Sequence, residues 1–401
     1  MSTARKEITA RIVTGMAEID AGRWDAIANP EPGRLDPFVT HAFLDALERS
    51  GSIAPKTGWL PQHLLIEETG GALLGAMPCY LKSHSLGEFV FDHGWADAYE
   101  RSGLDYYPKL LCAVPVTPVP GRRLLVKPGP GSEERERQLL AAAIELARRR
   151  KASSLHITFI EPEQCQRAEA EGLLHRTGVQ YHWSNAGYAS FEDFLATLAS
   201  RKRKALKRER RDALAAGISV EWLAGKEITE AHWDAFFAFY MDTGGRKWGS
   251  PYLNRRFFSL LGATLAERCL LIMARREGRY VAGALNMIGS DALYGRYWGC
   301  LEQHPFLHFE ICYYQAIDYA IANGLSRVEA GAGGEHKLVR GYLPTPTHSL
   351  HWIADARFRK AIADFVTRER AHLERESEAM VGMGPFRKGE RQGTDEDQGG
   401  V

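Results

Sequence analysis

The chain has 401 residues, of which 45% are hydrophobic and 25% charged, as is typical of a globular protein too long for one compact core. Its 51 basic and 50 acidic residues nearly cancel, which excludes a polycation built to coat nucleic acid or a membrane. The N-terminus lacks the apolar core of a signal peptide, and the six cysteines contain no CxxC pair. We therefore expect a two-domain cytoplasmic protein with reduced thiols and no membrane insertion.

The first half has the mixed pattern of an α/β domain. Two apolar runs separated by Thr69-Gly70-Gly71 predict a β-hairpin, because glycines allow the tight turn that joins two strands. In chain order we predict a helix over 24–50, hairpin strands over 63–68 and 72–82, strands over 89–95 and 123–126, a helix over 133–150 and a strand over 155–160.

The second half repeats this succession of hairpin, further strand, loop, buried helix and strand. The helix predicted over 309–323 is apolar on nearly all sides and should therefore be buried. The other predicted elements are a helical stretch over 191–216, a strand over 218–223, helices over 228–241 and 252–267, strands over 270–275, 280–288, 292–300, 327–330 and 348–353, and a last helix over 356–378.

These patterns predict an α/β (α+β) fold with two lobes, each a mixed sheet with packed helices. We place the N-terminal lobe at residues 1–190 and the C-terminal lobe, which contains a basic helix, at 191–381. Residues 382–401 are rich in Gly, Asp, Glu, Gln and Arg and are predicted to be a disordered tail.

Three stretches of the second half together resemble the Fem-like branch of the N-acyltransferase (GNAT) superfamily, and in particular its peptidoglycan-related Fem-like group. They are the basic helix 200–211 with Gly217-Ile218-Ser219-Val220, the segment Gly295-Arg-Tyr-Trp-Gly-Cys300 with 307–315, and the segment Glu329-Ala-Gly-Ala-Gly-Gly-Glu-His-Lys337 leading to 340–344. The match spans about residues 10–375.

The resemblance implies two acyltransferase-like lobes and transfer of an activated acyl or aminoacyl group to an amine. The helical-hairpin arm of some Fem-type enzymes has no counterpart, because no long heptad segment occurs between residues 218 and 350. The tRNA-dependent, cell-wall role of those enzymes therefore does not transfer directly.

Transfer to an amine needs a group that removes the amine proton. Glu310 opens the apolar helix, and Glu335 follows a strand end and a glycine run, where α/β sheets place ligand contacts. With His308 and His336 beside them, these four residues are the candidate catalytic groups. The alternatives are that Glu310 only complements the helix dipole and that Glu335 is a solvated charge on a tight turn.

Cations and aromatic residues near these positions are candidate substrate contacts, because an acyl donor and its acceptor carry carbonyl, carboxylate or phosphate groups. Tyr297 and Trp298 are neighbours on a strand, so one should face the core and the other the cleft. The candidate substrate-binding residues are Arg296, Tyr297, Trp298, Lys337, Arg340, Arg246 and Lys247.

Two regions are candidates for binding phosphate. The run 201–211 holds eight cations and one acid, and in the first half a glycine-rich loop joins a strand to a helix whose N-cap is predicted to be Ser132. The candidate residues are Lys202, Lys204, Lys207, Arg208, Gly129, Gly131 and Ser132. A solvated helix and a plain strand-to-helix turn are the respective alternatives.

No tightly bound cofactor and no metal site are predicted, and acyl-CoA or aminoacyl-tRNA is the expected co-substrate. His304 and His308 are four residues apart, but Pro305 argues against one helical face, and His336, His348 and His351 follow much later. The expected partners are a small-molecule or peptide acceptor and a tRNA held by the helix 201–211. A non-catalytic module of the same fold that binds a nucleotide-linked or peptide ligand is the main alternative, and a metal-assisted hydrolase is a weaker one.

Overall fold

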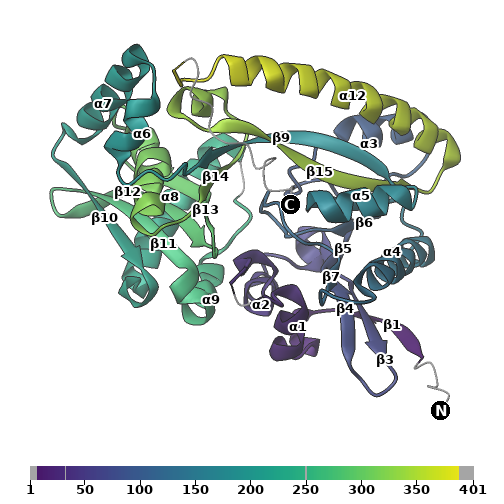
Figure 1. Ribbon diagram of the computed structural model, residues 1–401. Helices are drawn as coiled ribbons and strands as arrows, with labels where there is room; N and C mark the ends of the chain where they lie inside the picture. The colour runs from purple at the N-terminus through teal and green to yellow at the C-terminus, as the bar shows by residue number, and fades with distance from the viewer. Residues whose placement is uncertain (1–6, 32, 249–250, 388–401) are drawn as a thin grey trace. The chain divides into compact units, whose positions relative to one another are not determined.

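The computed structural model describes residues 7–31, 33–248 and 251–387, except the side chains at 247, 248, 332 and 335 (Figure 1). The chain forms two compact units made of discontinuous segments. Unit 1 comprises Met1–Gly178, Tyr252–Leu261 and Pro346–Glu374, and unit 2 comprises Val179–Pro251, Gly262–Thr345 and Arg375–Val401. The sequence placed one boundary after residue 190, whereas the chain passes between units within two strands, β9 (Leu174–Ser184) and β15 (Leu343–Ile353).

Unit 1 contains a four-stranded sheet of order β1-β3-β4-β7 and the strand run β15-β8-β6-β5-β2. The predicted hairpin is confirmed, since β3 pairs antiparallel with β4. The elements are β1 (Ile8–Val13), α1 (Ala21–Ala28), α2 (His41–Arg49), β2 (Trp59–Pro61), β3 (His63–Glu68), β4 (Leu73–Met77), β5 (Cys79–Lys82), α3 (His93–Arg101), β6 (Lys109–Cys112), β7 (Leu125–Val126), α4 (Ser132–Arg149), β8 (Ser154–Ile160) and α5 (Pro162–Ala170).

Local signals explain where several unit 1 elements begin and end. The predicted helix 24–50 is two helices, each with its own N-cap: Asp20 accepts from the N–H of Arg23, and Thr40 accepts from the N–H of Phe43. The strand predicted over 89–95 is wrong, because α3 begins at His93 and buries Trp95 at helical spacing. Helix α5 and strand β9 were not predicted.

Unit 2 is built on the strand run β10-β11-β12-β13-β14-β9. Strands β10 to β13 pair antiparallel, and β13 then pairs parallel with β14. Its elements are α6 (Phe191–Thr197), α7 (Ser200–Leu214), β10 (Ile218–Ala224), α8 (Glu230–Trp248), β11 (Cys269–Arg276), β12 (Arg279–Ile288), β13 (Ala292–Cys300), α10 (Leu307–Phe309), the π-helical turn η6 (Glu310–Tyr314), α11 (Gln315–Ala322), β14 (Arg327–Ala332) and the 3-10 helix η7 (Glu335–Arg340). The remaining helices are α9 (Arg255–Leu265), which spans the division between units, and α12 (Ala356–Gly382).

The sheet of unit 2 is covered on both faces. On one face, alternate strand residues such as Ile272 and Ala284 pack against η6 and α11 through Ile311 and Ile317, which are fully buried. On the other face, α8 packs against β12 and β13. The predicted burial of the helix after β13 is therefore confirmed, although its first turns form α10 and η6 instead of regular α-helix.

Both units contain the same sequence of pairings. In unit 1, β5 pairs antiparallel with β6, β6 pairs parallel with β8, and β8 pairs antiparallel with β15. In unit 2, β12 pairs antiparallel with β13, β13 pairs parallel with β14, and β14 pairs antiparallel with β9. The last strand of each sheet thus comes from the part of the chain that follows the other unit.

The first residues of the predicted tail are ordered. Phe386 bridges to Leu198, and the Ala199 N–H donates to the carbonyl oxygen of Pro385 at 2.9 Å. The remainder of the predicted tail, from residue 388, lies outside the described residues. None of the described helices is long and apolar enough to cross a membrane.

Candidate functional site

A pocket of about 390 Å³ lies in unit 2 where β13 ends. Three elements contribute to it: the C-terminal half of α8, the end of β13, and the loop that leads into α10. Its lining residues are Thr243, Arg246, Trp298, Cys300, Glu302, Gln303, His304, Leu307 and His308. Three of the predicted site residues, Arg246, Trp298 and His308, therefore meet in one cavity.

The floor of the pocket depends on a close approach of α8 to β13. A Cβ at Gly299 would lie 2.1 Å from the carbonyl oxygen of Phe239, so only glycine lets the helix backbone reach the strand there. The Cys300 N–H then donates to the hydroxyl of Thr243 at 3.3 Å, and Arg246 donates to the Cys300 carbonyl oxygen at 3.1 Å. Side chains of α8 thus form hydrogen bonds with the backbone N–H and carbonyl groups at the end of β13, beside the pocket.

The loop between β13 and α10 holds one strained residue. Phe306 has φ 61°, in the left-handed region that non-glycine residues rarely adopt. This conformation turns the chain sharply before α10, and the Leu307 N–H donates back to the carbonyl oxygen of His304 at 3.3 Å. Residues held in this way are concentrated at functional sites, and here the turn carries both pocket histidines.

His304 forms a dyad with Glu302 that the sequence analysis did not predict. His304 Nε2 lies 2.9 Å from Glu302 Oε2, and Arg276 Nη1 lies 3.1 Å from the same carboxylate oxygen. The hydrogen bond from His304, followed by that from Arg276, lowers the pKa of Glu302. When Nε2–H donates to Glu302, Nδ1 is the nitrogen of His304 that carries the lone pair.

His308 belongs to an aromatic cluster that continues from the pocket. Its ring lies 5.2 Å from Trp298, 5.4 Å from Tyr313 and 6.2 Å from His336, centroid to centroid. The hydroxyl of Tyr313 and Nε2 of His336 are 2.9 Å apart, and burial raises the pKa of Tyr313. The structure thus brings the two predicted histidines together.

Glu310 does not reach this cluster. Its carboxylate is fully buried and accepts from Arg210 at 2.8 and 3.1 Å and from Gln315 at 2.8 Å. Arg210 also contacts Asp318 at 2.6 Å and covers the ring of Phe191. This environment is that of a structural ion pair joining α7 to η6 and α11, because the buried carboxylate is held by the half-buried side chains of Arg210 and Gln315. The side chain of Glu335 lies outside the described residues.

The predicted cations of β13 and η7 are buried and bound to other protein groups. Lys337 Nζ donates to the carbonyl oxygens of Ala330 and Gly331 at 2.9 Å each, and burial, with the nearby Arg296, lowers its pKa to about 8. Arg296 Nη2 lies 3.8 Å from Glu329. These side chains lie where β13 and β14 separate, because the parallel pairing stops at Tyr294 and Glu329.

The remaining predicted substrate contacts lie elsewhere in unit 2. Arg340 pairs with Glu209 at 2.8 Å, and its guanidinium lies 3.4 Å from the centre of the Phe309 ring. Tyr297 packs edge-on against Tyr240 of α8, while Trp298 lines the pocket and also packs against the core of unit 2. The Lys247 side chain lies outside the described residues.

The predicted phosphate-binding cations of the basic helix α7 differ in whether they form ion pairs. Lys207 pairs with Glu192 at 2.6 Å and Arg208 with Asp212 at 3.3 Å. Within the described part of the chain, Lys202 and Lys204 make no ion pair, and they lie on the first turns of a helix that packs against α10 and η6. The predicted phosphate-binding residues of α7 therefore include two paired cations, Lys207 and Arg208, and two that form no ion pair among the described residues, Lys202 and Lys204.

The glycine-rich loop before α4 belongs to unit 1, whereas every other predicted site residue belongs to unit 2. The N-cap of α4 is Gly131 with φ 81°, and Ser132 is the first helical residue, so the predicted N-cap is wrong. Glu133 and Glu134 occupy the first turn. Their carboxylates already complement the helix dipole at Gly129, Gly131 and Ser132, and they oppose a bound phosphate.

Residues 15–388 match the FemAB-like family, which is described as peptidoglycan biosynthesis/recognition. The chain belongs to the FemAB-like family. The resemblance of the sequence motifs is thereby confirmed. A search of curated proteins finds no significant match.

Solved structures confirm the fold of this FemAB-like chain. The crystal structure of FemX matches with a TM-score of 0.55 at 16% identity, covering 86% of this chain and 98% of FemX. A conserved protein of unknown function from Bacteroides thetaiotaomicron VPI-5482 matches with a TM-score of 0.50 at 13% identity, covering 87% and 100%. A tandem GNAT protein from the clavulanic acid biosynthesis pathway is also similar, at 15% identity and a TM-score of 0.45 over 87% and 98%. The predicted α/β class, with two lobes that each contain a mixed sheet and packed helices, is confirmed.

A second group of titratable residues lies in unit 1 of the FemAB-like chain, and the sequence analysis missed it. Lys109 of β6 lies 2.8 Å from Glu88 and also pairs with Asp92, while Lys82 of β5 lies 3.9 Å from Glu88. Burial lowers the pKa of Lys82 to about 7 and raises that of Glu88 to about 7.

These side chains are closed off from solvent, with both lysines 0% exposed. The cluster continues to His156 of β8, whose Nε2 lies 2.7 Å from the hydroxyl of Ser154 and 4.0 Å from Asp92. The signal available in the sequence was a lysine within each of two otherwise apolar strands, Cys79–Lys82 and Lys109–Cys112.

Proposed function

We propose that the chain is an N-acyltransferase that moves an activated acyl or aminoacyl group onto an amine of a peptidoglycan-related acceptor, with the acceptor amine bound in the pocket at the end of β13. The observation that carries the proposal is the His304–Glu302 dyad in that pocket, within a unit of acyltransferase fold. The family description supports the class of acceptor.

In this mechanism Nδ1 of His304 accepts the proton of the acceptor amine. The nitrogen attacks the carbonyl carbon of the donor, a C–N bond forms, and the C–O bond of an ester or the C–S bond of a thioester breaks. His304 then returns the proton to the leaving oxygen or sulfur. Glu302 holds the ring in the required tautomer and stabilises the imidazolium that forms.

The other pocket residues have positioning roles. The paired register between β13 and β14 ends at Tyr294, and in this proposal the backbone beyond that point borders the carbonyl oxygen as it gains charge. Trp298 and His308 offer flat faces for the acyl or peptide portion. Arg246, which also pairs with Asp242 of α8, offers its remaining guanidinium N–H groups to a carboxylate of the acceptor. Glu310, the base suggested by the sequence, has no part in this proposal.

The test is transfer of labelled acyl groups from acetyl-CoA, and separately of amino acids from mixed aminoacyl-tRNA, to a stem peptide with a free side-chain amine. We expect product from one donor class, and His304→Gln should lower kcat by about 10²-fold, the usual contribution of a general base, with little change in the KM for the peptide. His308→Gln should act mainly on KM, and His372→Gln, at an exposed position of α12, should match the wild type.

The alternative of a non-catalytic module is favoured by the same family description, which covers recognition as well as biosynthesis. Its signature is calorimetric binding of the stem peptide with no transfer from either donor. Full kcat in His304→Gln would instead reject the dyad as the base and leave the transferase class standing.

A further inference from the structure

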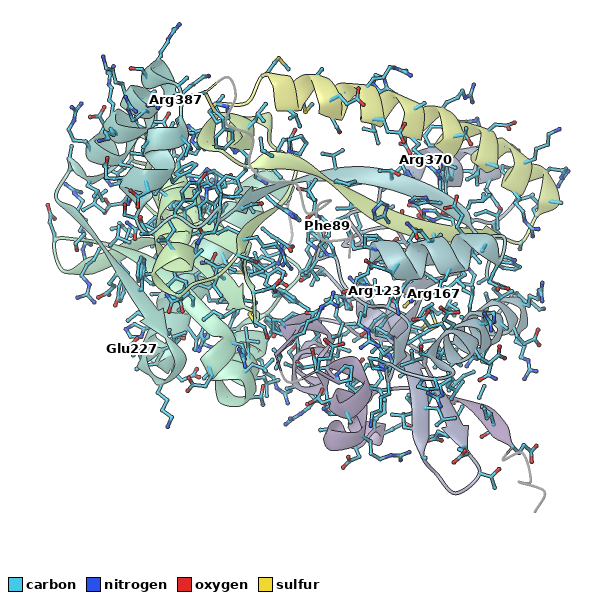
Figure 2. All side chains as sticks on the ribbon, in the orientation of Figure 1. Phe89, Arg123, Arg167, Glu227, Arg370 and Arg387 are labelled. Atoms are coloured by element: carbon cyan, nitrogen blue, oxygen red, sulfur yellow. The ribbon has the colours of Figure 1, made fainter. Side chains whose placement is uncertain are left out.

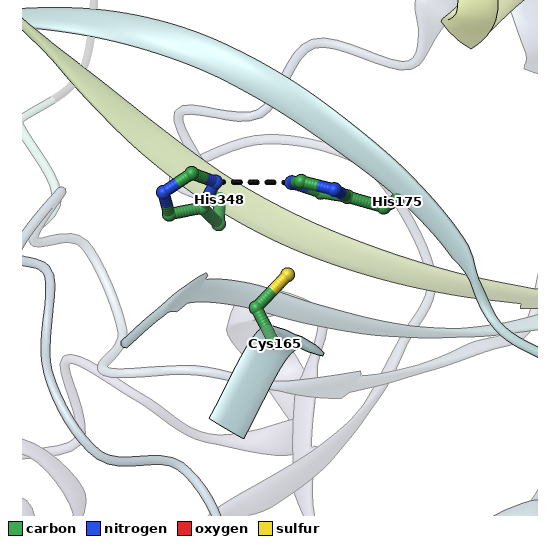
Figure 3. Close-up of side chains that lie close together, drawn as sticks. All are labelled: Cys165, His175 and His348. Carbon is green, nitrogen blue, oxygen red and sulfur yellow. Dashed lines mark hydrogen bonds between the residues drawn. The ribbon is translucent and has the colours of Figure 1, made fainter. Parts of the chain in front are cut away.

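Cys165, His175 and His348 converge in unit 1 from three different elements (Figure 3). Cys165 lies on α5, His175 near the start of β9 and His348 on β15. One ligand atom from each residue lies within 4.8 Å of the other two, and His175 Nε2 is 3.0 Å from His348 Nδ1. The three side chains thus surround one point, although His175 and His348 are 173 residues apart in the chain.

We propose that these three side chains form a Zn²⁺ site, independent of the transferase pocket, with a water molecule as the fourth ligand. One sulfur and two imidazole nitrogens are the donor set that zinc prefers, whereas Mg²⁺ and Ca²⁺ require oxygen ligands. Zinc bonded to sulfur at ~2.3 Å and to nitrogen at ~2.05 Å with tetrahedral angles needs N···N and S···N separations of roughly 3.3 and 3.6 Å. The two histidine nitrogens are 3.0 Å apart, so side-chain shifts of a few tenths of an ångström bring them to the N···N separation that zinc needs.

Glu169 supplies the outer contact that metal-binding histidines usually have. Its Oε2 lies 3.2 Å from His175 Nδ1, so this nitrogen carries the proton and Nε2 presents its lone pair to the site. His348 then needs only to carry its own proton on Nε2 for Nδ1 to become a ligand. The carboxylate orients the first histidine before any metal arrives.

The charges around the site are compatible with a dication. Arg370 of α12, labelled in Figure 2, is a nearby cation whose charge would repel Zn²⁺. Its guanidinium, however, lies 3.7 Å from the Glu169 carboxylate and donates to the carbonyl oxygen of His175 at 2.6 Å. A Cys165 thiolate and the Glu169 carboxylate together balance Zn²⁺, because each carries one negative charge. Zinc binds the thiolate form of cysteine, so the Cys165 thiol releases its proton when the metal binds.

The exposure of the ligand side chains indicates a site that a metal ion can enter from the side of His175. Cys165 is 2% exposed and packs in the main core of unit 1, while the His175 side chain is 13% exposed. Three protein ligands with one accessible direction leave room for a water ligand. Bound zinc would clamp α5 to β9 and β15, close to the residues at which both strands pass between units. Because it closes a long stretch of chain, the clamp should stabilise unit 1.

The experiment uses full-length protein without a histidine tag, stripped with EDTA and titrated with Zn²⁺ against a chromophoric chelator, and with Co²⁺ as a spectroscopic probe. We expect one Zn²⁺ per chain, a thiolate-to-cobalt charge-transfer band, and a higher unfolding temperature with Zn²⁺. Cys165→Ser should abolish the band, and His175→Gln and His348→Gln should each weaken Zn²⁺ binding at least about 100-fold. Glu169→Gln should weaken it about 10- to 100-fold.

Cys269→Ala and His372→Gln are matched controls outside the cluster and should bind Zn²⁺ as the wild type does. Wild-type protein that binds no stoichiometric Zn²⁺, or ligand variants that bind it as well as the controls, would overturn the proposal. Circular dichroism of each variant establishes that it is folded, and if Cys165→Ser does not fold, the two histidine variants carry the test. Transfer activity does not enter the readout, so the result is separate from the proposed function.

Discussion

Units 1 and 2 contain the same parallel crossover but place their polar residues differently on it. In unit 1, Lys109 at the start of β6 and His156 on β8 point into a closed cluster in which charged groups pair with one another. In unit 2, Trp298 and Cys300 at the end of β13 border a pocket of about 390 Å³. Buried and mutually paired charges mainly affect stability, whereas groups that line a cavity can meet a ligand.

The difference begins with how the chain enters the crossover helix of each unit. In unit 1, α4 starts at a glycine N-cap and carries Glu133 and Glu134 in its first turn, where their charges oppose a bound anion. In unit 2, the strained Phe306 leads into α10 and the π-helical turn η6, which places His308 at the pocket. A strained residue and a π-helical turn thus lie beside the pocket to which we assign the chemistry.

The largest effect that we predict in unit 2 concerns the ion pair between α7 and η6. Arg210→Met should lower the free energy of unfolding by about 3 kcal/mol, because it leaves the fully buried Glu310 carboxylate without its charged partner. The matched control is Lys207→Met on the same helix, whose exposed pair with Glu192 is worth at most about 1 kcal/mol. Urea unfolding of both variants measures the difference, and equal losses would contradict a structural role for Glu310.

The second prediction concerns the approach of α8 to β13. Gly299→Ala should cost about 1–3 kcal/mol, because its Cβ would lie 2.1 Å from the Phe239 carbonyl oxygen and the helix must shift. Gly245→Ala, in the same helix with no atom within 4 Å of the added Cβ, should not destabilise the protein. Thermal unfolding of the two variants tests whether this close contact shapes the pocket. An unchanged unfolding temperature for Gly299→Ala would show that it does not.

The sequence predicted most regular elements and the family, because apolar periodicity and short motifs are local signals. It also picked out Arg246, Trp298 and His308, which meet in the pocket. It missed the His304–Glu302 dyad, because both residues lie in an irregular loop whose course depends on Phe306. Glu310 was misleading for a similar reason: its partner Arg210 is 100 residues away in the chain, and the pairing of α7 with η6 is a tertiary property.

The third prediction returns to unit 1 and its dependence on pH. Burial, followed by the charge of Lys109, lowers the pKa of His156 to about 3, and burial also lowers that of His351. Between pH 6.5 and about 3 the unfolded chain binds a proton at His156 while the folded unit does not, and His351 acts in the same direction. The free energy of unfolding should therefore fall as the pH is lowered, by up to about 1.4 kcal/mol per pH unit for His156.

The comparison with His156→Gln isolates this contribution. Glu88, with its pKa raised to about 7, gives the opposite slope above pH 4.5, and it is present in both proteins. His175 and His348 also have pKa values lowered by burial, so the measurements are made with a chelator present. The variant should have a shallower slope below pH 6.5, and identical slopes would mean that His156 is protonated in the folded state.

The smallest effect on stability, and the sharpest on binding, is expected on the surface of α7. Lys202 and Lys204 make no ion pair within the described part of the chain, whereas Glu192 and Asp212 neutralise Lys207 and Arg208. Two double variants each remove two charges from this helix: Lys202→Gln/Lys204→Gln and Lys207→Gln/Arg208→Gln. Each should change the free energy of unfolding by less than about 0.5 kcal/mol.

Only the Lys202/Lys204 double variant should weaken binding of a tRNA probe. It should also reduce the slope of log affinity against log salt by about 1.4–1.8, because only cations outside ion pairs displace counterions from phosphates. Fluorescence anisotropy across a salt series measures both quantities, and equal losses in the two double variants would return the whole helix to the role of a solvated face.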